Sequence, residues 1–296
     1  MDPAAPGLVV LATVSLVPGI VWVWFFYRKD RAEPEPKTLV IRSFAFGVVS
    51  VFPAALLEAP FRRVIATGRK DLLALLVVSI FVVGVVEEVS KFVAVKLAAY
   101  DNPEFDEVMD GVVYAVAAGL GFAATENLFY ASAYGLAVGV VRAFITDLAH
   151  ASFSGIVGYY LGRAKADAPH ATALVARGLG IAIALHGAYD FLIIGGIVPP
   201  GFGIFMVLGT YAYLSRKIAQ AERLSPFATR PPVAGERPLG STPLRSKKHA
   251  WTHAPAAMET AADALTRVPH SRDGVQPDSP QVEAHAEGAG RAFEEE

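Results

Sequence analysis

Long apolar segments alternate with short polar ones from the N-terminus to about residue 220. Most of the apolar segments have about 20 residues or more, the length that a helix needs to cross the hydrocarbon layer of a membrane. The polar segments between them are rich in Pro, Gly and charged residues, as turns are. The pattern therefore predicts an all-α, polytopic bundle of about seven transmembrane helices. These are expected at Leu8–Tyr27, Thr38–Leu57, Leu72–Leu97, Gly111–Ala133, Leu136–Leu161, Ala173–Ile194 and Phe202–Leu214.

The first apolar segment, Leu8–Tyr27, is interpreted as a retained transmembrane helix. No lysine or arginine precedes it, and it is longer than the apolar core of a signal peptide. Trp22, Trp24 and Tyr27 lie towards its end, where aromatic residues are typical of a membrane surface.

Residues 221–296 differ in composition from the rest of the chain. They are rich in Pro, Ala, Gly, Ser and charged residues and lack apolar periodicity. Such a segment cannot bury enough apolar surface to offset the entropy of ordering. We therefore divide the chain into a transmembrane domain, residues 1–220, and a disordered tail, residues 221–296. Basic residues in the first and fifth loops and at the start of the tail predict a cytoplasmic tail, although the basic residues at 62–70 then lie outside.

Composition supports a membrane protein. The 296 residues are 53% hydrophobic and only 18% charged, whereas about 25% charge is usual in soluble domains, and the mean hydropathy is +0.42. The chain has no cysteine, which excludes disulfides, thiolate metal sites and cysteine nucleophiles. The net charge of −2 says nothing about nucleic acid, but no basic face stands out, and no nucleic-acid partner is expected.

Several polar and ionisable residues lie inside the predicted spans. Each charged group near the bilayer centre costs about 2.5–3.5 kcal/mol on insertion scales, so such groups face the bundle interior and indicate function. They are Glu87, Glu88 and Lys91 in the third span, Glu126 and Asn127 in the fourth, Arg142, Asp147 and His150 in the fifth, and His186 and Asp190 in the sixth. Glu87, His150 and His186 each lie about halfway along their segments, which predicts that they meet at similar depth.

Helical spacing relates these residues to one another. Glu87 and Lys91 are one turn apart and share a helix face, whereas the adjacent Glu87 and Glu88 point about 100° apart. One glutamate can therefore serve a reaction while the other holds Lys91 or a neighbouring helix. His186 and Asp190 are also one turn apart, so the carboxylate can orient the imidazole.

Two glutamates and two histidines on separate helices predict a hydrolytic site. A glutamate in a partly dry site suits a general base, and a histidine can share the proton or steady the attacking water. A second histidine with an acidic partner can donate to a developing oxyanion. The same residue types also bind zinc, with Glu88, His150 and His186 as the candidate ligands. No HExxH motif is present, and metal-independent hydrolysis is favoured.

Four blocks of the sequence resemble the PrsW family of bacterial intramembrane proteases: VVEEVSKF, FDEVMDGVVYAVAAGLGFAATENLFY, DLAHASFSG and HGAYDFL. They occur in order over residues 82–192. The resemblance implies a multi-pass protease of the plasma membrane that cuts a membrane-anchored substrate. It further implies an anti-sigma factor as a substrate and a stress response as the output.

The family is also similar to the CAAX-processing type of glutamate-dependent membrane protease. That similarity implies catalytic roles for Glu87 or Glu88 with His150 in activating water, and for His186 with Asp190 in stabilising the oxyanion. Lys91, Glu126 and Asn127 are expected to support the site. Asp190 stands where the CAAX type usually has asparagine.

Two other classes use buried ionisable residues. A proton-coupled transporter would use them as a relay, but such proteins often show inverted repeats or broken helices in matching halves, and none is evident here. A catalytically silent membrane scaffold on the same fold is the other alternative. Substitution of the two glutamates separates these hypotheses, because only a protease would lose cleavage.

Overall fold

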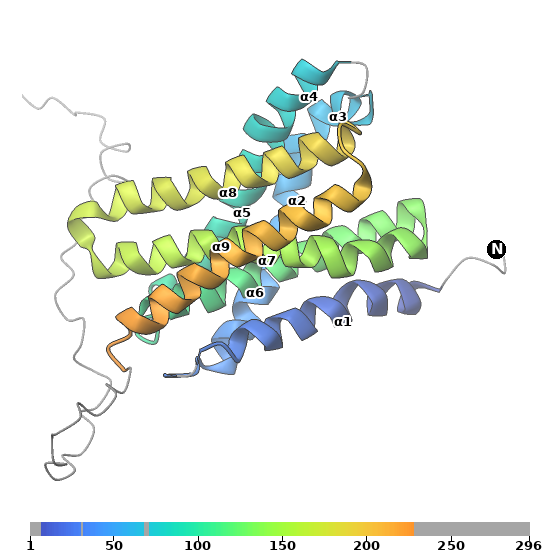
Figure 1. Ribbon diagram of the computed structural model, residues 1–296. Coiled ribbons are helices and arrows are strands. Elements are labelled where there is room, and N and C mark those ends of the chain that lie inside the picture. The colour runs from blue at the N-terminus through green and yellow to red at the C-terminus, as the bar shows by residue number, and fades with distance from the viewer. Residues whose placement is uncertain (1–6, 31, 68–70, 228–296) are drawn as a thin grey trace, which may run out of the picture. The chain divides into compact units, whose positions relative to one another are not determined.

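The computed structural model describes residues 7–30, 32–67 and 71–227 of the chain. Within these residues the secondary structure is helical, without strands, as the apolar pattern predicts (Figure 1). In chain order the elements are α1 Leu8–Tyr27, α2 Lys37–Glu58, η1 Ala59–Phe61, α3 Arg62–Thr67, α4 Leu72–Val78, η3 Ser79–Gly84, α5 Val85–Val95, η4 Lys96–Tyr100, α6 Val108–Tyr134, α7 Leu136–Ala166, η5 Ala168–His170, α8 Ala171–Ile194 and α9 Pro200–Leu224.

Six helical segments are long and apolar enough to cross a membrane. They are Leu8–Tyr27, Lys37–Thr67, Leu72–Tyr100, Val108–Tyr134, Leu136–Ala166 and Ala168–Ile194. Each matches a predicted span, usually with a few more residues at one or both ends. The seventh predicted span is observed as α9, which is not among the six because basic and acidic residues follow its apolar half.

Helix α9 also extends to Leu224, past the predicted start of the tail at residue 221. Residues 228–296, which make up most of the predicted tail, lie outside the described residues. Their disorder therefore stays a prediction.

Helix α6 forms the centre of the bundle. It contacts α1, α2, α5, α7 and α9, and nearly all of its length is buried. A helix that is apolar on every side is stable only when other helices cover it. Because α6 carries small residues along much of its length, its neighbours can approach closely.

Helices α6 and α7 approach each other closely. A side-chain carbon added to Gly158 would lie 2.0 Å from the main-chain oxygen of Gly111, and one added to Gly162 would lie 2.7 Å from that of Val108. The small residues at 158 and 162, one turn apart, therefore let the two backbones touch. This contact sets the depth of His150 on α7 relative to Glu126 on α6.

We expect Gly158→Ala to destabilise the protein, because the added methyl group overlaps the α6 backbone. Overpacking typically costs about 1–3 kcal/mol, which should appear as a lower melting temperature and a lower yield of folded protein in detergent. Gly180→Ala is the matched control, since nothing lies within 4 Å of the carbon it would add. Equal melting temperatures for the two variants would contradict the close packing of α6 on α7.

A π-helical turn, Ser79–Gly84, interrupts the third span directly before α5. Helix α8 packs against this turn, where a carbon added to Gly187 would lie 2.6 Å from Cα of Ile80. Turns of this kind occur frequently at functional sites. Here the turn changes the helical register just before Glu87, and the glycine brings His186 next to α5.

Candidate active site

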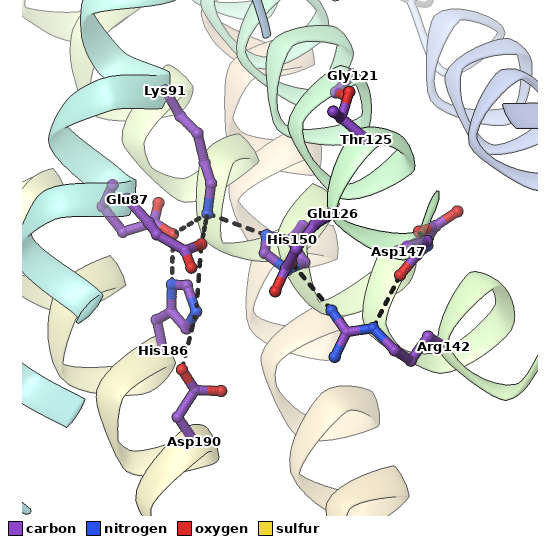
Figure 2. A network of polar contacts seen from close by, with 12 residues as sticks. Glu87, Lys91, Gly121, Thr125, Glu126, Arg142, Asp147, His150, His186 and Asp190 are labelled. Atoms are coloured by element: carbon purple, nitrogen blue, oxygen red, sulfur yellow. Dashed lines mark hydrogen bonds and ion pairs between the residues drawn. The ribbon is translucent and has the colours of Figure 1, made fainter. Parts of the chain in front are cut away.

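The ammonium group of Lys91 lies at the centre of the polar cluster (Figure 2). Its Nζ is 3.0 Å from Oε2 of Glu87, 2.9 Å from Oε1 of Glu88 and 3.0 Å from Nδ1 of His150. It also lies 4.4 Å from the centroid of the Phe122 ring. Lys91 is 1% exposed. Its positive charge lies in an apolar environment, and the two carboxylates compensate it.

His186 of α8 approaches the same cluster from the other side. Its Nδ1 is 2.8 Å from Oε1 of Glu88, whereas its Nε2 is 3.7 Å from Oε2 of Glu87 and 3.5 Å from Oδ2 of Asp190. The closest acidic partner of the imidazole is therefore Glu88, and not the Asp190 that the spacing on α8 suggests. With Nδ1 held by Glu88, the Nε2 atom is free of short contacts.

Both ring nitrogens of His150 have partners. An ammonium group can only donate, so the Lys91 contact requires Nδ1 of His150 to accept, which leaves the proton on Nε2. That atom is 3.2 Å from Oε2 of Glu126 on α6. His150 is thus held between α5 and α6, with its tautomer fixed by the two contacts.

A second set of contacts supports Glu126. Its Oε2 also lies 3.0 Å from a terminal nitrogen of Arg142, whose Nε donates to Oδ1 of Asn127 at 3.0 Å. The Asn127 side chain donates in turn to Asp147 at 2.6 Å. This network joins α6 to α7 and fixes the carboxylate that faces His150.

Two aromatic rings fix the planes of the histidines. Phe122 stacks on His150 with ring centroids 5.9 Å apart, and Phe153 stacks on His186 at 5.1 Å. The two imidazoles lie 5.3 Å apart, edge to face. The aromatic walls restrict ring rotation, so both histidines present defined atoms to the space between them.

A cavity of about 350 Å³ adjoins these groups. Its walls include Glu87, Glu126, Arg142, Thr146, His150, His186, Tyr189 and Asp190. Glu88 is fully buried behind this wall and faces Lys91 and His186. The structure therefore separates the two adjacent glutamates: Glu87 faces the cavity, and Glu88 faces the protein interior.

The residues singled out in the sequence lie together in the structure. Glu87, Glu88, Lys91, His150 and His186 form direct contacts, and Asp190 and Glu126 lie at the edge of the same group. Their predicted convergence from separate helices is confirmed by these distances. Asn127 contributes through Arg142 and Asp147, one step from the histidines.

Glu58, the last residue of α2, is a cavity residue that no pattern in the sequence indicated. Glu58 lines the cavity at Glu87 and also an adjoining cavity of about 700 Å³ between α2 and α6. Its Oε1 is buried without a hydrogen-bond partner among the described residues. In the sequence, Glu58 is a single carboxylate directly after an apolar run. A carboxylate in that position is also typical of an ordinary helix end, so it did not indicate a functional residue. Tyr130, which stacks on Arg142 at 3.7 Å, was likewise missed.

Metal coordination is compatible with three of these residues. Glu87, His150 and His186 each bring one ligand atom to within 4.8 Å of the others, and all three are buried. One carboxylate with two imidazoles is a donor set that zinc accepts. Glu87 replaces the Glu88 expected from the sequence, because Glu88 lies behind the cavity wall. Glu87 and His150 also contact Lys91, so a metal ion and the ammonium group would compete for them.

A polytopic helical bundle with buried acid and imidazole groups around a cavity is compatible with an intramembrane hydrolase. Comparison with known proteins gives the family: residues 35–214 match the model of the PrsW family of intramembrane metalloproteases. The chain belongs to this family and is an intramembrane protease of the bacterial cell membrane.

Several curated relatives carry the name Protease PrsW. The protein from Geobacillus kaustophilus is 33% identical over 232 residues, covering 76% of this chain and 98% of the relative. The one from Bacillus subtilis is 34% identical over 184 residues, covering 62% of this chain and 82% of the relative. The one from Clostridioides difficile is 31% identical over 193 residues, covering 63% and 79%. No solved structure matches the chain.

Proposed function

We propose that the protein hydrolyses a peptide bond of a membrane-anchored protein, with water activated in the cavity beside Glu87. The observation that carries this proposal is a continuous set of contacts among groups from three helices. Lys91 contacts the cavity-lining Glu87, the buried Glu88 and His150, and Glu88 in turn contacts His186. Such a group provides a proton acceptor, a fixed positive charge and hydrogen-bond donors, which amide hydrolysis needs.

Glu87 is the general base in this proposal. Its carboxylate faces the cavity and takes a proton from a water molecule, whose oxygen then attacks the peptide carbonyl carbon. The same proton passes to the amide nitrogen as the carbon–nitrogen bond breaks. Lys91 holds the carboxylate in position through its contact at 3.0 Å.

His186 and Asp190 stabilise the oxyanion. Glu88 accepts a hydrogen bond from Nδ1 of His186 and so fixes the ring, while the Nε2 side of His186 faces Glu87 and Asp190 at the cavity wall. When that nitrogen carries a proton, it can donate to the negatively charged oxygen of the tetrahedral intermediate. Asp190 then acts through His186, because a carboxylate cannot itself donate.

His150 borders the cavity and acts on the attacking water through Lys91, which it helps to hold beside Glu87. Lys91 and Glu126 hold both of its ring nitrogens, and this fixes the imidazole edge that borders the cavity. Zinc bound by Glu87, His150 and His186 would supply Lewis-acid polarisation of the carbonyl oxygen or of the water.

The substrate in this proposal is a membrane-anchored protein, and an anti-sigma factor is the class that the resemblance in sequence indicates. The cavity of about 700 Å³ between α2 and α6 reaches Glu87 and Glu126 and has largely apolar walls, including Val51, Phe122 and Phe129. An extended segment of a membrane-spanning substrate has the apolar character that such walls accommodate.

Reconstitution in liposomes tests the proposal. The purified chain is combined with single-span anti-sigma factors of the encoding organism, with or without 1,10-phenanthroline, and products are followed by mass spectrometry. We expect cleavage of an anchored substrate but not of its soluble domain alone. Inhibition by the chelator that zinc restores would assign the metal role, and full activity in chelator would assign the metal-free route. Failure to cut any anti-sigma factor would overturn the substrate class, and equal cleavage of the soluble domains would overturn the intramembrane site.

A further inference from the structure

A second group of buried acidic residues lies far from the proposed active site. Asp30 and Glu35 come from the segment between α1 and α2, and Asp110 comes from the first turn of α6. Each of the three brings one carboxylate oxygen to within 4.8 Å of the others. Asp110 and Glu126 are sixteen residues apart on one helix, which separates the two sites by about 24 Å along its axis.

The carboxylates are held in place by neighbouring groups. Oδ2 of Asp110 accepts hydrogen bonds from the main-chain N–H groups of Asp106 and Glu107, both at 2.7 Å. The Tyr114 hydroxyl donates to Oε2 of Glu35, and the Tyr27 hydroxyl donates to the main-chain oxygen of Glu35 at 3.0 Å. These contacts order the group but bring no positive charge to it.

Two buried oxygens in the group have no hydrogen-bond partner among the described residues: Oδ2 of Asp30 and Oδ1 of Asp110. Asp30 is 4% exposed and Asp110 is fully buried. Buried polar atoms are nearly always paired, and an unpaired buried charge is costly. Unpaired buried oxygens in a group of carboxylates indicate a bound cation, because a cation takes such oxygens as its ligands.

No described lysine or arginine forms an ion pair with these three carboxylates. Lys165 lies in the last turn of α7, which is beside the start of α6. It donates instead to the main-chain oxygens of Tyr100 and Asn102. Glu107 adds a fourth acid nearby and is 5% exposed.

We propose that Asp30, Glu35 and Asp110 bind a hard divalent cation, Mg²⁺ or Ca²⁺, which ties the α1–α2 segment to the start of α6. Carboxylate oxygens without imidazole or thiolate are the donors that these ions prefer. The ion neutralises the group and pairs the free oxygens of Asp30 and Asp110. Its role is structural, and the site is distinct from Glu87, His150 and His186.

Thermal unfolding of the full chain in detergent tests this site without reference to cleavage. The protein is stripped with EDTA and then titrated with MgCl₂ or CaCl₂ at constant ionic strength. We expect the melting temperature to rise with the logarithm of the cation concentration once this exceeds the dissociation constant, by about 5–10 °C at roughly 100 times that constant. The ion that gives a chosen rise at the lower concentration is the preferred one.

Asp30→Asn should remove most of this rise, because it neutralises a ligand without disturbing the first turn of α6. Asp101→Asn is the matched control, since Asp101 is an exposed carboxylate that precedes α6 at the same end, and it should keep the full rise. A wild-type protein whose melting temperature responds to neither cation would overturn the proposal. An equal rise in wild type and Asp30→Asn would also overturn it.

Discussion

Glu87→Gln should lower the rate of substrate cleavage by about 10²–10⁴-fold, the usual contribution of a general base. Glutamine has nearly the same shape and can still accept a hydrogen bond from Lys91, but it cannot take a proton from water. The folded protein should therefore persist at wild-type abundance. The measurement is the single-turnover rate of cleavage in liposomes, together with the melting temperature of the same preparation.

Glu88→Gln gives a useful comparison, because Glu88 faces His186 and Lys91 and does not line the cavity. It should reduce cleavage less than Glu87→Gln, through a looser His186. The control is Asp101→Asn, which lies outside the polar cluster and should cut at the wild-type rate. If Glu87→Gln cuts as fast as the control, Glu87 is not the base.

Lys91→Met should destabilise the protein strongly as well as inactivate it. The substitution leaves Glu87 and Glu88 buried without the cation that both contact. Removing one partner of a buried ion pair typically costs about 3–5 kcal/mol. The expected result is a much lower melting temperature and little folded protein after detergent extraction.

A double variant separates lost charge from lost packing. Adding Glu87→Gln to Lys91→Met removes one of the unpaired carboxylates, so it should recover part of the lost stability. Lys96→Met is the control, since Lys96 is only partly buried on the same continuous helix. If Lys96→Met and Lys91→Met have the same melting temperature, the buried charge network does not stabilise the bundle.

The sequence was sufficient to predict the helices and the main polar residues. Apolar length alone located the spans, because an uninterrupted apolar run has few alternatives to crossing a membrane. The cost of burying charge in lipid directed attention to Glu87, Lys91, His150 and His186. Both signals are local, so they can be recognised in a single sequence without knowledge of how the helices pack.

Which glutamate faces the cavity could not be predicted. Helical spacing shows that Glu87 and Glu88 diverge, but the π-helical turn at Ser79–Gly84 sets the direction in which each one points. The turn is stabilised by packing against α8 around Gly187. Such packing depends on residues about a hundred positions away, which a local pattern does not reveal.

The contacts between helices also could not be predicted from the sequence pattern. The spacing on α8 suggested Asp190 as the partner of His186, whereas Glu88 on α5 lies closer. Asp147 and His150 share a face of α7, yet Asp147 accepts from Asn127 and His150 contacts Glu126. In each case a residue on another helix lies nearer than the one a turn away.

The measurement that tests the central claim most directly is the mass of the cleavage products formed in H₂¹⁸O. The claim is that water activated beside Glu87 hydrolyses a peptide bond within the membrane. It predicts a cut inside the membrane-spanning segment of the substrate, with one ¹⁸O in the new C-terminal carboxylate, and no such product from Glu87→Gln. A cut confined to the water-exposed flank of the substrate, or the same labelled product from Glu87→Gln, would contradict it.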